Sequence, residues 1–401
     1  AAIATMANDA GAKLLFLDAP NAQALDPVRN RIGAQRIALD GSAAGVSFGD
    51  WLAPEGARPE PVSIGPEWPF NFIYSSGTTG APKGIVQSHH MRWMQLQRAT
   101  TFYGPDAVTL VSTPLYSNTT LVSFLPTVAL GGSAVLMAKF DAAAFLALAQ
   151  KHRATHSMLV PVQYQRILAQ PDFGRHDLSS YRFKSCTSAP FSAALKADIV
   201  ARWPGALIEY YGMTEGGGVC ILEAHLHPDK LHTVGLPAPG HDLRLIDESG
   251  NELPAGAIGE IVGRSEQIMD GYHNQPAKTA EALWHDAQGR RYIRTGDIGR
   301  FDDDGFLILM DRRKDMIISG GFNVYPSDLE LVLRDHPAVA DVAVVGVPSE
   351  RWGETPVAFA VLRPGAAVEA EALRGWANER LGKMQRLSAV EFVERLPRSG
   401  I

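Results

Sequence analysis

The chain has 401 residues, of which 46% are hydrophobic and 20% are charged, a balance typical of globular proteins that excludes disordered, collagen-like and coiled-coil chains. It is too long for one ordinary core, so we expect two or three domains. The net charge of −6 offers no basic field that could attract a polyanion, which argues against nucleic acid as a partner.

The cysteines bear on the cellular location of the protein, and the chain ends bear on whether the sequence is part of a longer one. Cys186 and Cys220 provide no disulfide framework and no zinc-binding pair, so a reducing, cytoplasmic location is expected. No apolar run approaches the roughly 20 residues of a membrane-spanning helix. The start lacks an initiator Met and a signal-peptide pattern, and the end, LPRSGI, has no helix or strand terminator. We expect both ends to be interior points of a longer protein, and the oligomeric state stays open, with a homodimer as one option.

The first predicted strand is FNFIY, which ends at Tyr74. Two strand–helix–strand units follow, the first at 132–137, 140–152 (after a cap at Asp141) and 156–160, the second at 182–189, 192–203 and 206–211. This alternation predicts a parallel sheet covered by helices. Ligands of such sheets bind beyond the carboxyl ends of the strands, which points to the loops after Tyr74, Ser185 and Tyr211.

The pattern changes twice in the second half of the chain. Short strands and tight turns from about 237 to 311 predict a small β-rich subdomain, and the strands 339–347 and 356–362 with a helix at 369–381 predict an α+β domain. We therefore expect an α/β protein with a large N-terminal region, residues 1–312, and a small mobile α+β domain, residues 313–401. The charged run 311–315 suits an exposed hinge between them.

The segment YSSGTTGAPKG at 74–84 has the composition of a phosphate-binding loop. Its glycines permit close approach of backbone N–H groups, its hydroxyls donate further hydrogen bonds, and Lys83 offers a positive charge. Because Lys83 is followed by Gly84 and not by Ser or Thr, the loop is not a Walker A motif.

The same string resembles the signature phosphate loop of the adenylate-forming superfamily of AMP-binding enzymes, in its acyl-CoA synthetase branch. Further blocks that resemble this family follow in the family's order: YGMTE at 211–215, GEI at 259–261, YIRTGD at 292–297 and DRRKDMIISGG at 311–321. The resemblance covers nearly the whole chain.

The resemblance implies a role for individual residues. Lys83, Thr214 and Glu215 are the implied catalytic residues, with Thr214 on the α-phosphate and Glu215 as the ligand of Mg²⁺, an ion that prefers oxygen ligands. Tyr211 would stack on adenine, Asp297 would accept the ribose hydroxyls, and Arg312 would add a contact to the sugar or phosphate. The full implied ATP and AMP site comprises Ser75, Ser76, Gly77, Thr78, Thr79, Gly80, Lys83, Ser188, Ala189, Pro190, Tyr210, Tyr211, Gly212, Met213, Thr214, Asp297 and Arg312.

The resemblance implies an ATP-dependent acid–CoA ligase. A carboxylic acid and ATP would form an acyl-adenylate and pyrophosphate, and coenzyme A would then displace AMP, so ATP, Mg²⁺ and coenzyme A are the expected cofactor and co-substrates. Lys314 matches the hinge of the small domain, and Ser319, Gly320 and Gly321 match the strip that closes the coenzyme A tunnel. The family's adenylation lysine would fall just beyond Ile401, so the chain as it stands is expected to form adenylate weakly or not at all unless the protein continues.

The residues that bind the acid are the hardest part of the site to predict from the sequence. No charged residue occurs from Thr109 to Ala138 or in the segment 185–191, so these walls offer no partner for an ammonium group or a second carboxylate. A monocarboxylic fatty or aryl acid is therefore expected. The candidate pocket residues are Tyr116, Asn118, Phe124, Thr187 and Phe191.

Two alternatives stay open. An adenylation domain that loads an amino acid onto a carrier protein needs a carboxylate for the substrate ammonium, which the uncharged segments do not supply. A nucleotide-binding relative without catalysis is opposed by the intact Lys83, Glu215 and Asp297. The sequence names neither the acid nor the acceptor thiol.

Overall fold

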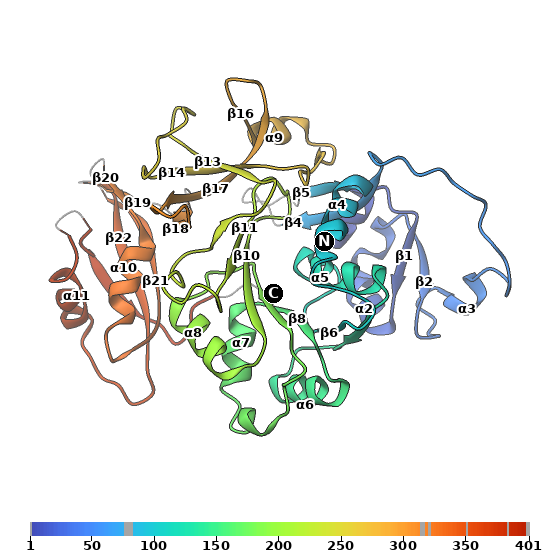
Figure 1. The fold of residues 1–401 in the computed structure, drawn as a ribbon, viewed down its shortest axis with the longest axis horizontal. Helices are drawn as coiled ribbons and strands as arrows, with labels where there is room; N and C mark the ends of the chain where they lie inside the picture. The colour runs from blue at the N-terminus through green and yellow to red at the C-terminus, as the bar shows by residue number, and fades with distance from the viewer. Residues whose placement is uncertain are drawn as a thin grey trace.

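The structure is a computed structural model that describes residues 2–75, 83–312, 317–319, 322–349, 352–382 and 385–397. Figure 1 shows its main parts: a central sheet with helices below it, a β-rich layer at the top, an N-terminal sheet at the right and the C-terminal strands at the left. None of the helices within these ranges is long and apolar enough to cross a membrane.

The central sheet has seven strands in the order β12-β11-β10-β9-β8-β6-β7. The five strands from β10 to β7 are parallel, and β11 and β12 extend one edge antiparallel. The prediction of a parallel sheet is confirmed, although the antiparallel edge was not predicted. The strands are β6 (Val108–Val111), β7 (Ser133–Leu136), β8 (His156–Leu159), β9 (Phe183–Cys186), β10 (Ala206–Tyr211), β11 (Cys220–Glu223) and β12 (Leu236–Pro237).

Two helices of the central sheet begin at side-chain caps, and the cap at Asp141 was predicted from the sequence. Asp141 Oδ1 accepts the N–H of Ala144 at 2.8 Å, and the Ser192 hydroxyl accepts the N–H of Leu195 at 3.3 Å. The apolar faces of α6, α7 and α8 pack into one core with the strands, around the buried rings of Phe145, Tyr164 and Trp203. The helices are α5 (Asn118–Ala129), α6 (Ala142–His152), α7 (Pro161–Leu168) and α8 (Ala193–Arg202), with a 3₁₀ turn at Phe173–Arg175.

Two smaller sheets lie at the N-terminal side. In the first, β4 (Pro69–Ser75) and β5 (Lys83–Ser88) pair antiparallel, β5 also pairs with β15 (Gly271–Tyr272), and β5 leads into α4 (His89–Ala99). The second is a parallel sheet of β1 (Leu14–Leu17), β2 (Gln35–Ala38) and β3 (Val46–Ser47). Around it lie α1 (Ala2–Asp9), α2 (Ala19–Leu25), a 3₁₀ turn at Asp26–Arg31 and α3 (Phe48–Trp51). Tyr74 Oη joins the two regions because it donates to Asp9 Oδ2 at 2.6 Å.

The predicted β-rich subdomain is present as an antiparallel sheet. Its strands are β13 (Asp242–Ile246), β14 (Gly259–Arg264), β16 (Leu283–His285), β17 (Arg291–Phe301) and β18 (Leu307–Arg312), with α9 (Pro276–Glu281) beside them.

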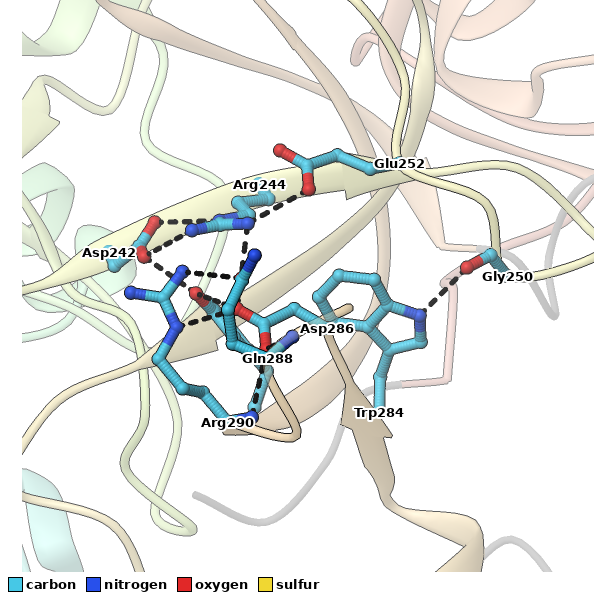
Figure 2. Close-up of polar contacts among 9 residues, drawn as sticks. Asp242, Arg244, Gly250, Glu252, Trp284, Asp286, Gln288 and Arg290 are labelled. Atoms are coloured by element: carbon cyan, nitrogen blue, oxygen red, sulfur yellow. Dashed lines mark hydrogen bonds and ion pairs between the residues drawn. The ribbon is translucent and has the colours of Figure 1, made fainter.

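A polar network on this sheet fixes two of its turns (Figure 2). Arg244 donates to both carboxylate oxygens of Asp242 and, at 2.8 Å, to Glu252. The Asp286 side chain is 1% exposed and accepts the N–H groups of Gln288 and Arg290, which closes the turn between β16 and β17. Trp284 Nε1 donates to the carbonyl of Gly250 at 2.8 Å, so the turn at 247–251 is held against β16.

The last strands form a sheet in the order β20-β19-β22-β21, with β23 paired to β22. They are β19 (Ile317–Ser319), β20 (Phe322–Val324), β21 (Val339–Ser349), β22 (Gly353–Leu362) and β23 (Ala389–Phe392), covered by α10 (Pro326–Arg334) and α11 (Ala370–Asn378). Their own core includes Leu329, Val342 and Leu373. The Ser327 hydroxyl donates to the Met310 carbonyl at 2.5 Å, so α10 lies against β18. The boundary near 312 and the mobility of this part stay predictions.

Two lysines are buried beneath the central sheet. Lys196 pairs with the buried carboxylate of Glu209 and donates to the carbonyls of Leu231 and Thr233, each at 2.9 Å. Lys184 is fully buried, and its ammonium donates to two carbonyls, of Pro204 at 2.7 Å and of Gly205 at 2.6 Å. Burial lowers the pKa of Lys184 to about 7, because the apolar surroundings disfavour the charged form.

This pKa predicts a pH-dependent stability. Between about pH 7 and pH 10.5 the unfolded lysine binds a proton that the folded lysine has lost, so Lys184 makes the free energy of unfolding rise with pH across this window. Lys184→Met removes the titration. Urea unfolding at several pH values should show that the stability difference between the wild type and Lys184→Met shifts in favour of the wild type as pH rises, whereas a constant difference would contradict the low pKa.

Candidate functional site

A cavity of about 1530 Å³ lies beyond the carboxyl ends of the parallel strands, where the sheet rule places a ligand. Its wall includes the loops that follow β9 and β10, the last residue of β4, and parts of α4, α5, β11 and β17. Of the residues singled out in the sequence, the wall contains Ser75, Lys83, Asn118, Thr187, Ser188, Tyr210, Tyr211, Gly212, Met213, Thr214 and Glu215.

The loop from Gly212 to Val219 connects β10 to β11 and carries Thr214 and Glu215. The Glu215 carbonyl accepts the N–H of Met269 at 2.8 Å, and the N–H of Gly217 donates to the Gln267 carbonyl at 2.9 Å. Gly216 has a φ of +76°, and a Cβ there would lie 1.8 Å from the Gln267 carbonyl oxygen. Only glycine allows this approach, so the segment 267–269 fixes the backbone next to Glu215.

Glu215 and Lys83 are joined through Tyr272. The Glu215 side chain is buried and its Oε1 accepts the Tyr272 hydroxyl at 2.9 Å. The ammonium nitrogen of Lys83 lies 4.8 Å from the centre of the same ring. Burial and the nearby Glu215 raise the pKa of Tyr272, so its hydroxyl stays a donor. A cation and a carboxylate thus stand together on the cavity wall.

The carbonyl of Thr214 is fixed from β5. Gln87 is fully buried, and its Nε2 donates to this carbonyl at 2.7 Å. The Gln87 oxygen in turn accepts Arg92 of α4. This chain of contacts sets the loop against the strand that begins at Lys83.

Tyr211 and Asp297 also meet. The Tyr211 hydroxyl donates to Asp297 Oδ2 at 2.8 Å, and burial, followed by the charge of Asp297, raises the pKa of Tyr211. By backbone register Asp297 in β17 lies opposite Arg312 in β18. The resemblance assigns Tyr211, Asp297 and Arg312 to one nucleoside, and in the structure Asp297 neighbours both of the others.

The loop after β9 has an unusual backbone. Ser188 has a φ of +76°, rare for a residue with a side chain. Its hydroxyl bonds to Thr119 Oγ1 at 2.6 Å, and Thr187 donates to the Tyr210 carbonyl at 2.8 Å. These contacts hold the strained loop against α5 and β10. Ala189 and Pro190 follow on the exposed side.

The acid-pocket candidates separate into two groups. Asn118 and Thr187 line the cavity, and Asn118 Oδ1 is buried without a hydrogen-bond partner among the described residues. Tyr116 is 72% exposed, and Phe191 packs against Tyr164 in the core below the sheet. Within the part of the chain that the structure describes, Tyr116, Phe124 and Phe191 are not on the cavity wall.

The expectation of an uncharged pocket needs a correction. The segments 109–138 and 185–191 indeed carry no charge, but α4 and β11 bring Arg98 and Glu223 to the same cavity. The sequence offered no signal for this, because the cavity is assembled from elements far apart in the chain.

Several predicted residues cannot be placed. Lys314 and the runs Ser76–Gly80 and Gly320–Gly321 lie outside the described residues, and so does the side chain of Arg312. Ser319 is half-buried in β19, where it pairs by backbone with Gly353. Their predicted roles stay predictions.

Three residues that contribute to the site were missed by sequence reasoning. Tyr272 reaches Glu215 because β15 pairs with β5, and His241 contacts Arg98, which lies on the cavity wall. None of the three lies in a recognised motif, so spacing alone could not have found them.

Comparison with known proteins agrees with this geometry. The family profile "AMP-binding enzyme" matches residues 1–273, and "AMP-binding enzyme C-terminal domain" matches residues 328–400. A feruloyl-CoA synthase of Amycolatopsis is 37% identical over 82% of the chain and 66% of its own length. A medium/long-chain-fatty-acid–CoA ligase of Mycobacterium tuberculosis is 34% identical over 87% of the chain and 63% of its own length. The structure of the amide bond synthetase McbA from Marinactinospora thermotolerans matches with a TM-score of 0.84 and 32% identity, over 99% of the chain and 79% of that protein.

The chain thus spans about two thirds of the length of the curated relatives it matches. The profile "AMP-binding enzyme" covers most of the chain, and the matched residues include those that line the cavity from Ser75 to Tyr272. The chain therefore belongs to the AMP-binding enzyme family, with acyl-CoA ligases among its relatives, as the sequence motifs predicted.

Proposed function

We propose that the protein is an ATP-dependent acid–CoA ligase, which activates a carboxylic acid as acyl-adenylate and transfers the acyl group to the thiol of coenzyme A. The observation that carries this proposal is the group of Lys83, Tyr272 and Glu215 on the cavity wall. In this group a positive charge and a buried carboxylate stand together, and Lys83 pairs by backbone with Ser75 at the base of the predicted phosphate-binding loop.

The chemistry needs positioning and charge more than a protein nucleophile. A carboxylate resists attack by a thiol, so its oxygen first attacks the α-phosphate of ATP and pyrophosphate leaves. In this step Lys83 would stabilise charge on the phosphate oxygens. The thiol would then attack the acyl carbonyl, the carbon–oxygen bond to phosphate would break, AMP would leave as a phosphate anion, and the thiol proton would pass to the solvent.

Glu215 fits a magnesium site. Mg²⁺ commonly takes one or two carboxylates from the protein and completes its shell with phosphate oxygens and water. Within the described residues there is no cluster of three or more His, Cys, Asp or Glu that could form an all-protein cage. Tyr272 holds Glu215 Oε1, so Oε2 would be the oxygen that binds the ion, and the ion would offset the charge of the phosphates.

The nucleoside would occupy the side of the cavity near β17. Tyr211 would offer its ring to adenine while its hydroxyl holds Asp297, and Asp297 would accept the ribose hydroxyls. Ser75, Ser188 and the segment Tyr210–Thr214 would surround the α-phosphate and base. The contacts predicted for Arg312 and for the part of the phosphate loop outside the described residues are also part of this proposal.

The acid is proposed to have an apolar body, such as that of a fatty or aryl acid. Val122, Met158 and Tyr103 on the cavity wall support this class, and so do the names of the two curated relatives. The expected restriction to monocarboxylic acids rested on uncharged walls, and Arg98 removes that support. A homodimer and a cytoplasmic location stay predictions.

The metal role predicts a loss of adenylation in Glu215→Gln. The neutral amide keeps the size of the side chain but removes the charge that binds Mg²⁺, so we expect acid-dependent ATP–pyrophosphate exchange to fall by about 10²-fold or more. Glu248→Gln, in an exposed turn, serves as the control and should exchange at the wild-type rate. Near-normal exchange in Glu215→Gln would reject the metal role.

The hydrogen bond from Tyr272 predicts a smaller effect. Tyr272→Phe leaves Glu215 without its donor, and because a bond to a charged group is worth about 1.5–3 kcal/mol, Mg²⁺-dependent ATP binding should weaken by about 10-fold or more. Tyr292→Phe is the matched control, since that hydroxyl donates to Asp242 outside the cavity at 2.6 Å. Calorimetric titration with Mg-ATP compares the two, and equal effects would show that the Tyr272 bond has no special role.

The acceptor is tested on the complete protein with a panel of fatty and aryl acids. We expect thioester to form with free coenzyme A after adenylation. Adenylation followed by transfer only to a carrier-protein thiol, or only to an amine, would instead favour a carrier-loading or an amide-forming ligase. Nucleotide binding without exchange for any acid would favour a non-catalytic relative.

A further inference from the structure

Arg98 is a charged residue on the cavity wall that the proposed reaction does not use. It lies in the last turn of α4 and is half-buried. One terminal nitrogen donates to the Pro239 carbonyl at 2.5 Å, and the other contacts His241 Nε2. Both acceptors are neutral groups, and within the described residues Arg98 forms no ion pair.

The state of His241 supports this description. Burial, together with the charge of Arg98, lowers the pKa of His241 to about 4, so the ring is neutral near pH 7. Its Nε2 can then accept from Arg98 while Nδ1–H donates to the Gly217 carbonyl at 3.0 Å. Arg98 is thereby held in place by groups that leave its charge uncompensated, and it is connected to the loop that carries Glu215.

A guanidinium has five N–H donors, and these two contacts use part of them. A half-buried charge without an opposite charge lowers stability, whereas an acidic oxygen that reaches it gains a charge-assisted hydrogen bond. The same part of the cavity wall carries the apolar Ala99, Phe102 and the ring of Tyr103 together with the neutral polar Gln95 and Thr101. These side chains can contact the body of an organic acid and bring no charge of their own.

We propose that Arg98 is a specificity residue that binds an oxygen acceptor at the end of the acid remote from the carboxyl group that is activated. The inference rests on the proposed acid–CoA ligase function and narrows its substrate to acids with a second oxygen group, a carboxylate or a hydroxyl. Tyr210 lies close enough to interact electrostatically with Arg98 and with Glu223, and it offers a further hydroxyl beside this group.

The experiment compares matched acids in ATP–pyrophosphate exchange on the complete protein. The panel contains cinnamic acid with its para-methyl, para-hydroxy and para-carboxy derivatives, and hexanoic acid with adipic acid. For the wild type we expect kcat/KM to be about 10-fold or more higher for a para-hydroxy or para-carboxy acid than for its para-methyl analogue. The para-hydroxy and para-carboxy arms show which oxygen group is preferred.

Three variants decide the role of Arg98. Arg98→Met should reduce the preference to near unity, mainly through KM, and leave exchange with the para-methyl acid and the KM for ATP within about 3-fold of the wild type. Arg98→Lys should keep part of the preference for the carboxylate because it keeps the charge. Arg202→Met removes an arginine from the last turn of α8, and it should leave the substrate preference and the KM for ATP unchanged. Melting temperatures check that each variant folds.

The outcomes separate the two levels of the proposal. If the wild type prefers the para-methyl acids, or if Arg98→Met lowers exchange equally for every acid or raises the KM for ATP, the Arg98 assignment is wrong while the ligase function stands. If no acid of any kind supports exchange, the ligase function is wrong and the inference falls with it.

Discussion

The close packing of three glycines, Gly216, Gly217 and Gly218, is the constraint on which the site depends. A Cβ on Gly217 would lie 2.6 Å from the Gly263 carbonyl oxygen, and one on Gly218 would lie 2.9 Å from the Cα of Gly263. The loop after β10 can therefore touch β14 backbone to backbone, which joins the central sheet to the β-rich sheet. Because Glu215 directly precedes these glycines, its position relative to both sheets is set by main-chain contacts and not by its own side chain.

The polar groups around the cavity share a second property, since each is held in place by a hydrogen-bonded partner. Tyr272 holds one oxygen of Glu215, Tyr211 holds one oxygen of Asp297, and His241 holds one nitrogen of Arg98. Groups fixed in this way need little reorganisation when charge appears on a ligand, which is the condition for electrostatic stabilisation. Gly217 belongs to the glycine loop, and its carbonyl accepts a hydrogen bond from His241. The packing of the glycines therefore also positions the residue that holds Arg98. The loop that carries Glu215 is thus linked through His241 to Arg98.

The sequence predicted what depends on local chemistry. The cap at Asp141 and the strand that ends at Tyr211 both follow from residues next to the backbone that they order. Contacts between distant segments were not predictable. The strands β1 and β2 are short and show no alternation, and Tyr272 and Arg98 reach the cavity only through strand pairing and helix packing. Phe191 was wrongly predicted to line the pocket, and it packs in the core. An aromatic residue beside a binding loop can face the core as readily as the ligand.

The central claim is that a carboxylate oxygen of the acid attacks the α-phosphate of ATP in this cavity. It is tested most directly with an acid whose carboxyl oxygens carry a heavy isotope, incubated with the complete protein, ATP and coenzyme A. Because the attacking oxygen stays on phosphorus when the thiol displaces AMP, mass spectrometry should find one heavy oxygen in AMP and the other in the thioester. Heavy oxygen in inorganic phosphate, or unlabelled AMP alongside the thioester, would contradict the account.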